Sequence, residues 1–303
     1  MARRLPGRVA IFGLLALAGA IGIAGCDRFA KSAPPSIATA LGVAKDDLEL
    51  PEAKKVDAEP ADSGGHIVVS RTRLSVLGDP WTIAKIPADP ALGLAAEDKR
   101  NGRNSIPITP LVQAVEWQSK AAGGLAAHGT EQPVWVVVAD TKTTYRVACE
   151  VVVSAAEGGA WKIAFAAQNG DRAKPVGILA LTLVGGSERG RRDPLTVRFG
   201  EAGAAISTKK RTVGAGCKDV GPGPAVAREP NRPFDFGALE SCLKEVRKQD
   251  PELAREILQV GAEPATDLGT VIKVIDAARS AGFEHFNLAA PTAPEPPAGG
   301  ASP

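Results

Sequence analysis

The side chains that most often carry catalysis or bind metals are scarce in this chain. Its 303 residues include three His and four Cys, and no two Cys form a CxxC pair. Scattered ligands of this kind do not make a metal site, so we expect no metal and no cofactor. A catalytic dyad of Cys149 and His285 can be written, but the sequence suggests no orienting or oxyanion-stabilising group for it. We therefore expect a protein that is not an enzyme.

Two other cysteines, Cys217 and Cys242, have two possible states. In an oxidising compartment they could form a disulfide, which by loop-closure entropy is worth about 3 to 4 kcal/mol. Alternatively, Cys242 is a buried free thiol, because it lies on the apolar stripe of an expected helix. The sequence does not separate these states. Cys149 flanks another apolar stripe and is most simply a small core residue.

Three further features could serve function or structure. Asp140 follows an apolar strand and could be a functional carboxylate, although hydrogen bonding to its own following amides is the favoured role at a strand end. Tyr145 could contact a partner, but its place on an apolar helix face favours packing. The glycine-rich stretch 185–190 lacks the Lys-Ser/Thr of a phosphate loop and is typical of a hairpin. We expect three tryptophans in the core: Trp117, Trp135 and Trp161.

The charge balance argues against a nucleic-acid-binding protein. The chain has 36 Lys+Arg against 34 Asp+Glu and a single Tyr. Three of the positive charges, Arg3, Arg4 and Arg8, lie at the N-terminus, so no basic surface remains to neutralise phosphates and little is available for base stacking.

The N-terminus has the layout of a secretory signal. Its arginines precede an uncharged run, Val9 to Gly25, which is shorter than the roughly 20 apolar residues of a spanning helix. The residues Ile23-Ala24-Gly25-Cys26 resemble the bacterial lipobox, in which the Cys is lipidated and becomes the mature N-terminus. The alternative is an uncleaved anchor helix. We expect a signal peptide over 1–25, lipidation at Cys26, and attachment to a membrane facing the periplasm, with Asp27 favouring the inner membrane.

An internal repeat organises the rest of the chain. The segments 133–166 and 256–289 both predict strand, turn, amphipathic helix, glycine stop and strand, and aligning Gly159 with Gly282 gives an offset of 123 residues. The apolar stripe of the first helix contains Tyr145, Ala148, Val151, Val152 and Ala155. At the same offset the second helix has Leu268, Val271, Val274, Ile275 and Ala278. Arg146, Glu150 and Glu157 lie on the opposite side of the first helix, which we expect to be solvated.

Each copy continues upstream into a further helix and two strands. Helices are expected over 110–122 and 236–248, and strands over 66–76, 81–86, 176–184 and 195–199. The fold class is therefore α+β, as two tandem domains, each a small mixed sheet with two helices on one face. The expected boundaries are a flexible tether over 26–65, domains over 66–168 and 176–290, and a disordered tail over 291–303.

The repeated unit of strand, turn, helix, glycine and strand resembles the periplasmic domain of the ExbD/TolR family of biopolymer-transport proteins. The likeness rests on the strand end at Asp140, the helix that begins at Tyr145 and the stop at Gly159. The second copy fits less closely, because Glu263 and Leu268 replace the Asp and the Tyr, although Gly282 is kept. Leu48, Leu50 and Pro51 also resemble the apolar-x-Leu-Pro element that this family places between its anchor and its folded domain.

The resemblance implies a role beside a proton-conducting membrane partner. It implies ExbB/TolQ-like channel proteins and TonB/TolA-like proteins as partners, and peptidoglycan as a further one. The family's membrane helix carries an Asp for proton passage, whereas Val9 to Gly25 has no ionisable residue. We therefore expect an accessory, lipid-anchored relative with a doubled interaction domain, whose two copies either pair with each other or follow one another as separate domains. The alternative is a ligand-binding or scaffolding envelope lipoprotein with no energy coupling.

Overall fold

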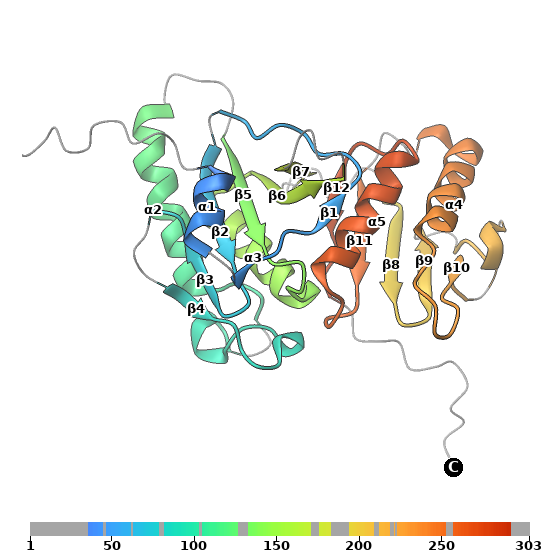
Figure 1. Ribbon diagram of the computed structural model, residues 1–303, viewed down its shortest axis with the longest axis horizontal. Coiled ribbons are helices and arrows are strands. Elements are labelled where there is room, and N and C mark those ends of the chain that lie inside the picture. The colour runs from blue at the N-terminus through green and yellow to red at the C-terminus, as the bar shows by residue number, and fades with distance from the viewer. Residues whose placement is uncertain are drawn as a thin grey trace, which may run out of the picture. The chain divides into compact units, whose positions relative to one another are not determined.

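A computed structural model describes most of the chain after residue 35 (Figure 1). The expected signal peptide, Cys26, Asp27, the glycine-rich stretch 185–190 and residues 292–303 lie outside the described residues. The fold is mixed α+β with two sheets and several helices, as the sequence predicts. The described ranges are 36–44, 47–61, 63–78, 82–102, 105–126, 133–170, 176–182, 194–208, 212–218, 221, 223–252 and 257–291.

The first sheet has the strand order β4-β3-β2-β5-β6, with β1 and β7 both paired to β6. The central strands β2, β5 and β6 are parallel, while β3 and β4 follow β2 as antiparallel neighbours. Its strands are β1 (Glu52–Ala53), β2 (Ser63–Val69), β3 (Arg73–Val76), β4 (Thr82–Lys85), β5 (Val134–Ala139), β6 (Lys162–Asn169) and β7 (Val176–Thr182).

The second sheet repeats this arrangement. Its order is β10-β9-β8-β11-β12, with β8, β11 and β12 parallel and β9 and β10 antiparallel. We call residues 63–169 copy one and residues 196–288 copy two, because both have the same strand order and directions. The strands are β8 (Thr196–Gly200), β9 (Gly203–Ser207), β10 (Val226–Ala227), β11 (Leu258–Ala262) and β12 (Phe286–Leu288).

Each copy packs two helices on its sheet. Copy one has α2 (Thr109–Ala126) and α3 (Tyr145–Glu157), and copy two has α4 (Phe236–Gln249) and α5 (Leu268–Ser280). The apolar stripes predicted for α3 and α5 are buried, and one hydrophobic core runs through both copies. Side chains of Thr144 and Asp267 cap the two helices. Gly159 and Gly282 have φ angles of +99° and +93°, which favour glycine.

Two strand expectations were wrong in detail. The described part of the segment expected to open copy two, 176–182, forms β7. This strand pairs antiparallel with β6 along seven residues, from Lys162↔Thr182 to Gln168↔Val176. An apolar strand fits either sheet, and β6 offers an unpaired edge a few residues upstream. The expected strand 66–76 is two strands, β2 and β3, joined by a turn at Ser70 to Thr72.

Part of the expected tether is folded. Helix α1 (Ile37–Ala44) covers the second face of the first sheet, where Ile37, Ala40 and Ala44 pack against Val68 and Val138. The Glu59 carboxylate accepts hydrogen bonds from the Ile37 amide and contacts Nε2 of the buried His66 at 2.6 Å. The uninterrupted apolar run of β5 explains this cover, because a strand that is apolar on both sides must be buried on both.

The outer side of α3, expected to be solvated, is covered by residues 86–102 and 105–108, which lie between β4 and α2. We call these residues the cover segment; it includes short 3₁₀ turns at Pro90–Leu92 and Ala96–Asp98. Glu150 is fully buried beneath it and accepts hydrogen bonds from Lys99 Nζ at 2.7 Å and from the Leu94 amide at 2.8 Å. The ion pair lowers the cost of burying this carboxylate, which periodicity alone assigns to water.

The tryptophans divide differently from the expectation. Trp135 is buried, but Trp117 and Trp161 are 69% and 58% exposed. Both exposed rings therefore contribute little to the core. Within the described residues, no helix combines the length and the apolar character needed to cross a membrane.

Candidate functional site

The two copies meet where β5 leads into α3 and β11 leads into α5. The Tyr145 amide donates to the Thr266 carbonyl and the Leu268 amide donates to the Thr143 carbonyl, both at 2.7 Å. Because Tyr145 and Leu268, like Thr143 and Thr266, are 123 residues apart, each bond is the counterpart of the other.

A second reciprocal pair lies beside the first. The Arg146 amide donates to the Pro264 carbonyl at 3.2 Å, and the Gly269 amide donates to the Thr141 carbonyl at 3.0 Å, again at the same offset. We call residues 141–146 and 264–269 the joint. Reciprocal contacts between equivalent residues define a two-fold interface, so the copies pair as the subunits of a symmetric dimer do.

Tyr145 extends this contact with its side chain. Its ring is fully buried and its hydroxyl donates to the Val260 carbonyl at 2.7 Å and also contacts the Ala289 carbonyl, both in or beside copy two. Burial raises the pKa of Tyr145 far above its ordinary value and that of the neighbouring Cys149 to about 12. The counterpart in copy two is Leu268, so this hydroxyl contact is made from one side only.

The structure does not bring Cys149 and His285 together as a dyad. Cys149 is buried and its thiol contacts the Ala289 carbonyl at 3.7 Å, whereas His285 is exposed. A thiol whose pKa is raised by burial is the opposite of an activated nucleophile.

Asp140 lies at the carboxyl end of β5 and is almost fully buried. Its Oδ1 accepts the Lys142 amide at 2.8 Å, which is the expected turn chemistry. Its Oδ2 accepts the Glu49 amide at 2.8 Å and Arg71 Nε at 3.2 Å. Asp140 therefore also holds the Leu48 to Pro51 element against copy one. The sequence pattern marks Asp140 and this element separately, and the structure places them in contact.

The chain that follows this element touches both copies. The Gln168 amide of β6 donates to the Pro51 carbonyl at 2.8 Å. The Lys54 amide donates to the buried Asp276 of α5 at 3.1 Å, and Arg279 of α5 pairs with Asp57 at 3.1 Å. Residues 48–57 are thus fixed to copy one and to copy two.

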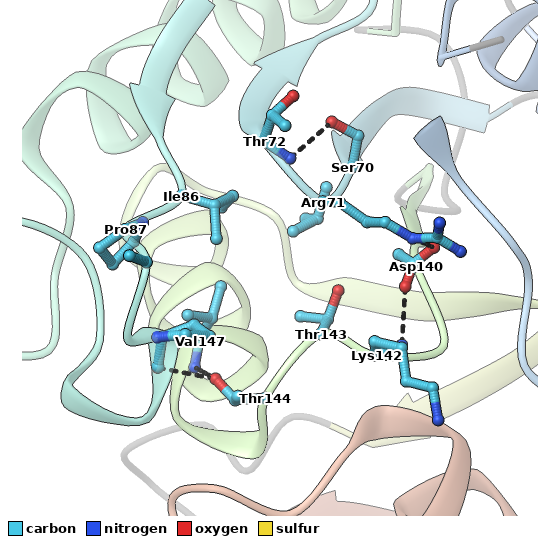
Figure 2. A pocket seen from close by; sticks show the side chains of 13 residues that line it. Ser70, Arg71, Thr72, Ile86, Pro87, Asp140, Lys142, Thr143, Thr144 and Val147 are labelled. Atoms are coloured by element: carbon cyan, nitrogen blue, oxygen red, sulfur yellow. Dashed lines mark hydrogen bonds and ion pairs between the residues drawn. The ribbon is translucent and has the colours of Figure 1, made fainter. Parts of the chain in front are cut away.

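A cavity of about 510 Å³ opens beside Asp140, at the carboxyl ends of the parallel strands β2 and β5 (Figure 2). Figure 2 shows Ile86 and Pro87 of the cover segment on one side and Arg71 with Asp140 on the other, with Thr143 between them. Val147 of α3 adds to the apolar side. The end of parallel strands is a common place for ligand sites in α/β folds.

The polar groups of the cavity fall into two classes. The Ser70 hydroxyl is used within its turn, where it accepts the amides of Thr72 and Arg73, and the Thr144 hydroxyl donates to the Pro90 carbonyl at 2.8 Å. The Lys142 ammonium and the Thr143 hydroxyl have no partner among the described residues. Among the described residues that line the cavity there is no His, Cys or Glu. The groups present can bind a polar ligand, but they do not form a nucleophile and base pair.

Copy two has a disulfide between Cys217 and Cys242, so of the two states left open by the sequence the structure has the bonded one. It ties the connection between β9 and β10 to α4. Within the described parts of the chain, no cluster of three His, Cys, Asp or Glu residues is arranged to hold a metal ion.

Sequence reasoning missed several residues of this region. Arg71 lies in the turn between β2 and β3, where the sequence pattern predicted one continuous strand over 66–76. The sequence pattern also did not predict Lys142 as a ligand-binding residue. A usable signal existed for both, because polar residues that follow neighbouring parallel strands meet at one edge of the sheet. Lys99 gave no signal, since nothing in the local sequence pairs it with Glu150.

Compared with known proteins, the chain matches no protein-family model, no curated protein and no solved structure.

Proposed function

We propose that this chain is an accessory, lipid-anchored component of an ExbD/TolR-type system for energised transport or envelope integrity. It acts by binding proteins in the periplasm, with peptidoglycan as a further candidate ligand. The lipid is attached at Cys26. Domains of that family tend to pair as dimers. The observation that carries the proposal is the joint, whose reciprocal bonds through Tyr145 and Leu268 supply such a pair within one chain.

The region nearest the anchor supports the same role. Residues 48–57 leave the expected membrane attachment and are fixed to both copies, through Asp140 in copy one and Asp276 in copy two. A force or displacement at the membrane would therefore reach both copies together. In this proposal the channel partner conducts protons, and the chain supplies binding surfaces.

Site-specific photocrosslinking in cells tests this function. A photoreactive residue replaces the exposed Lys55 beside the Leu48 to Pro51 element, and the matched control replaces the exposed Glu229 of copy two. Crosslinks at 55, but not at 229, to an ExbB/TolQ-like channel or a TonB/TolA-like protein support the proposal. It fails if neither class is captured at any position while Cys26→Ser still releases the chain from membranes, because the anchor would then be real without the partners.

The second candidate is a ligand-binding envelope lipoprotein with no energy coupling. The cavity beside Asp140 favours it, since it is lined by a mixture of apolar and cationic groups. This candidate is favoured if the chain binds a ligand in the cavity but crosslinks to no channel protein and to no TonB/TolA-like protein.

A further inference from the structure

We propose that the cavity beside Asp140 binds a small monocarboxylate with an apolar body, of about the size of an N-acylated dipeptide. The proposal does not depend on energy coupling and is compatible with either function above. It rests on the charge, the lining and the construction of the cavity.

The charge available to a ligand is positive. Arg71 and Lys142 line the cavity together with one carboxylate, Asp140. That carboxylate already accepts three hydrogen bonds, from the amides of Glu49 and Lys142 and from Arg71 Nε. Its charge is therefore largely satisfied. The Lys142 ammonium has no partner among the described residues, and the other nitrogens of Arg71 have only a loose contact of 3.7 Å with the exposed Glu49.

The surroundings favour one negative charge over two. Phosphate sites use free amides at a helix N-terminus, but the first amides of α3 are already used. Those of Tyr145 and Arg146 donate to copy two, and that of Val147 donates to the Thr144 hydroxyl. Asp47 accepts the hydroxyl of the lining residue Thr72, and Glu49 lies 3.7 Å from the lining residue Arg71, so both carboxylates would also repel a dianion. A carboxylate held by Arg71, with the positive charge of the exposed Lys142 at the edge of the cavity, fits this balance.

The rest of the cavity suits an apolar body. Ile86, Pro87 and Val147 form one side, and its volume of about 510 Å³ lies within the roughly 300–1,000 Å³ usual for small-molecule sites. The Thr143 hydroxyl lies between the two sides and can donate to a ligand carbonyl (Figure 2).

Two residues of the apolar side, Ile86 and Pro87, come from the cover segment, which copy one alone has at this length. The equivalent connection in copy two, between β10 and α4, spans only residues 228–235. The cover segment is held in place by the buried Lys99–Glu150 pair and by the bond from Thr144 to Pro90. At the position equivalent to Lys142, copy two has Ala265. Both the cation and the apolar wall are thus departures of copy one from the shared unit.

Titration of the full chain, purified in detergent and labelled with ¹⁵N, tests the inference. The probes are N-acetyl-alanyl-alanine in its L,L and D,D forms and the C-terminal amide of each. We expect saturable amide shifts at Arg71, Thr143 and Val147, with acids binding about tenfold tighter than amides, as a charge-assisted hydrogen bond provides. A preference for L,L indicates protein C-termini as the source, and one for D,D indicates cell-wall peptides.

Three variants make the test specific. Lys142→Gln should weaken acid binding about threefold to fivefold and leave amide binding unchanged. Lys162→Gln is the matched control, because Lys162 is exposed at the opposite end of the parallel strands. Ala88→Phe, at an exposed position of the cavity lining, should abolish binding by filling the space. Equal binding of acids and amides, unchanged affinity in Lys142→Gln or in a folded Ala88→Phe, or no shifts at millimolar probe overturns the inference.

Discussion

Thr144 and Asp267, the N-caps of α3 and α5, lie opposite each other in an isolated antiparallel bridge between the two copies. Each side chain caps its own helix, and the backbone around it bonds to the other copy. The start of both helices and the contact between the copies therefore depend on the same short loops. Changes in these loops should affect pairing and helix stability together.

A side chain at Gly269 should disrupt the joint. A Cβ there would lie 2.4 Å from Thr141 Oγ1, which is too close for any real contact. We expect Gly269→Leu to expose the amides of Tyr145, Arg146 and Leu268, which hydrogen exchange measures directly. The control, Gly42→Ala, has open space around it in α1 and should be neutral or stabilising by about 0.5–1 kcal/mol. Unchanged protection in Gly269→Leu would argue against the joint.

Stability should fall at alkaline pH because of Tyr145. Its folded pKa is raised far above its ordinary value, so above about pH 10 only the unfolded state releases this proton and unfolding is favoured. Tyr145→Phe should therefore remove up to about 1.4 kcal/mol of the decline per pH unit above 10. At neutral pH the same change should cost about 1 kcal/mol through the lost hydrogen bonds. Urea unfolding followed by tryptophan fluorescence measures both.

Cys149 provides the control for this prediction. Burial raises its pKa from 9.0 to about 12. The stability that the neutral thiol gives to the folded state is therefore lost as the pH rises between those two values. The Cys149→Ala variant should keep the fall in unfolding free energy that Tyr145 causes above about pH 10. It should lose the part of the fall that the Cys149 thiol causes. Identical slopes in wild type and Tyr145→Phe above pH 10 would show that Tyr145 ionises normally in the folded chain.

Removing Lys99 should loosen the cover segment. Lys99→Met leaves the buried Glu150 with Arg146 as its remaining cation, and we expect a cost of about 3 kcal/mol in unfolding free energy. Proteolysis within 86–108 should become faster. Arg100→Gln is the matched control, because its pair with Glu157 is exposed and worth under about 1 kcal/mol. Similar losses in both variants would contradict a special role for the buried pair.

The disulfide should stabilise copy two. Cys217 and Cys242 are 25 residues apart, and closing such a loop in the unfolded chain is worth about 3.5 kcal/mol. In a Cys217→Ser/Cys242→Ser double variant the free energy of unfolding, measured by urea denaturation, should be lower by that amount. Reducing agent should lower wild-type stability and leave the double variant unchanged. A wild type insensitive to reduction would indicate free thiols.

Periodicity predicted the parts of the fold in which local and tertiary preferences agree. The stripes led by Tyr145 and Leu268 are buried, and Gly159 and Gly282 adopt the left-handed conformation expected at helix ends. β7 was assigned to the wrong copy because strand pattern does not specify the neighbouring strand. Glu150 was placed in water because its partner, Lys99, is distant in sequence. The cavity depends on that same distant segment, so no local motif marks it.

The unequal connections have a consequence for how this molecule meets others. A dimer of identical chains repeats every loop, so its two faces are alike and its sites come in twos. Here the shared joint keeps the symmetry at the centre, while the cover segment changes one half and the disulfide-bound connection changes the other. The covalent pair can therefore be monovalent for a ligand and can distinguish its two sides, which fixes a direction in an otherwise symmetric assembly.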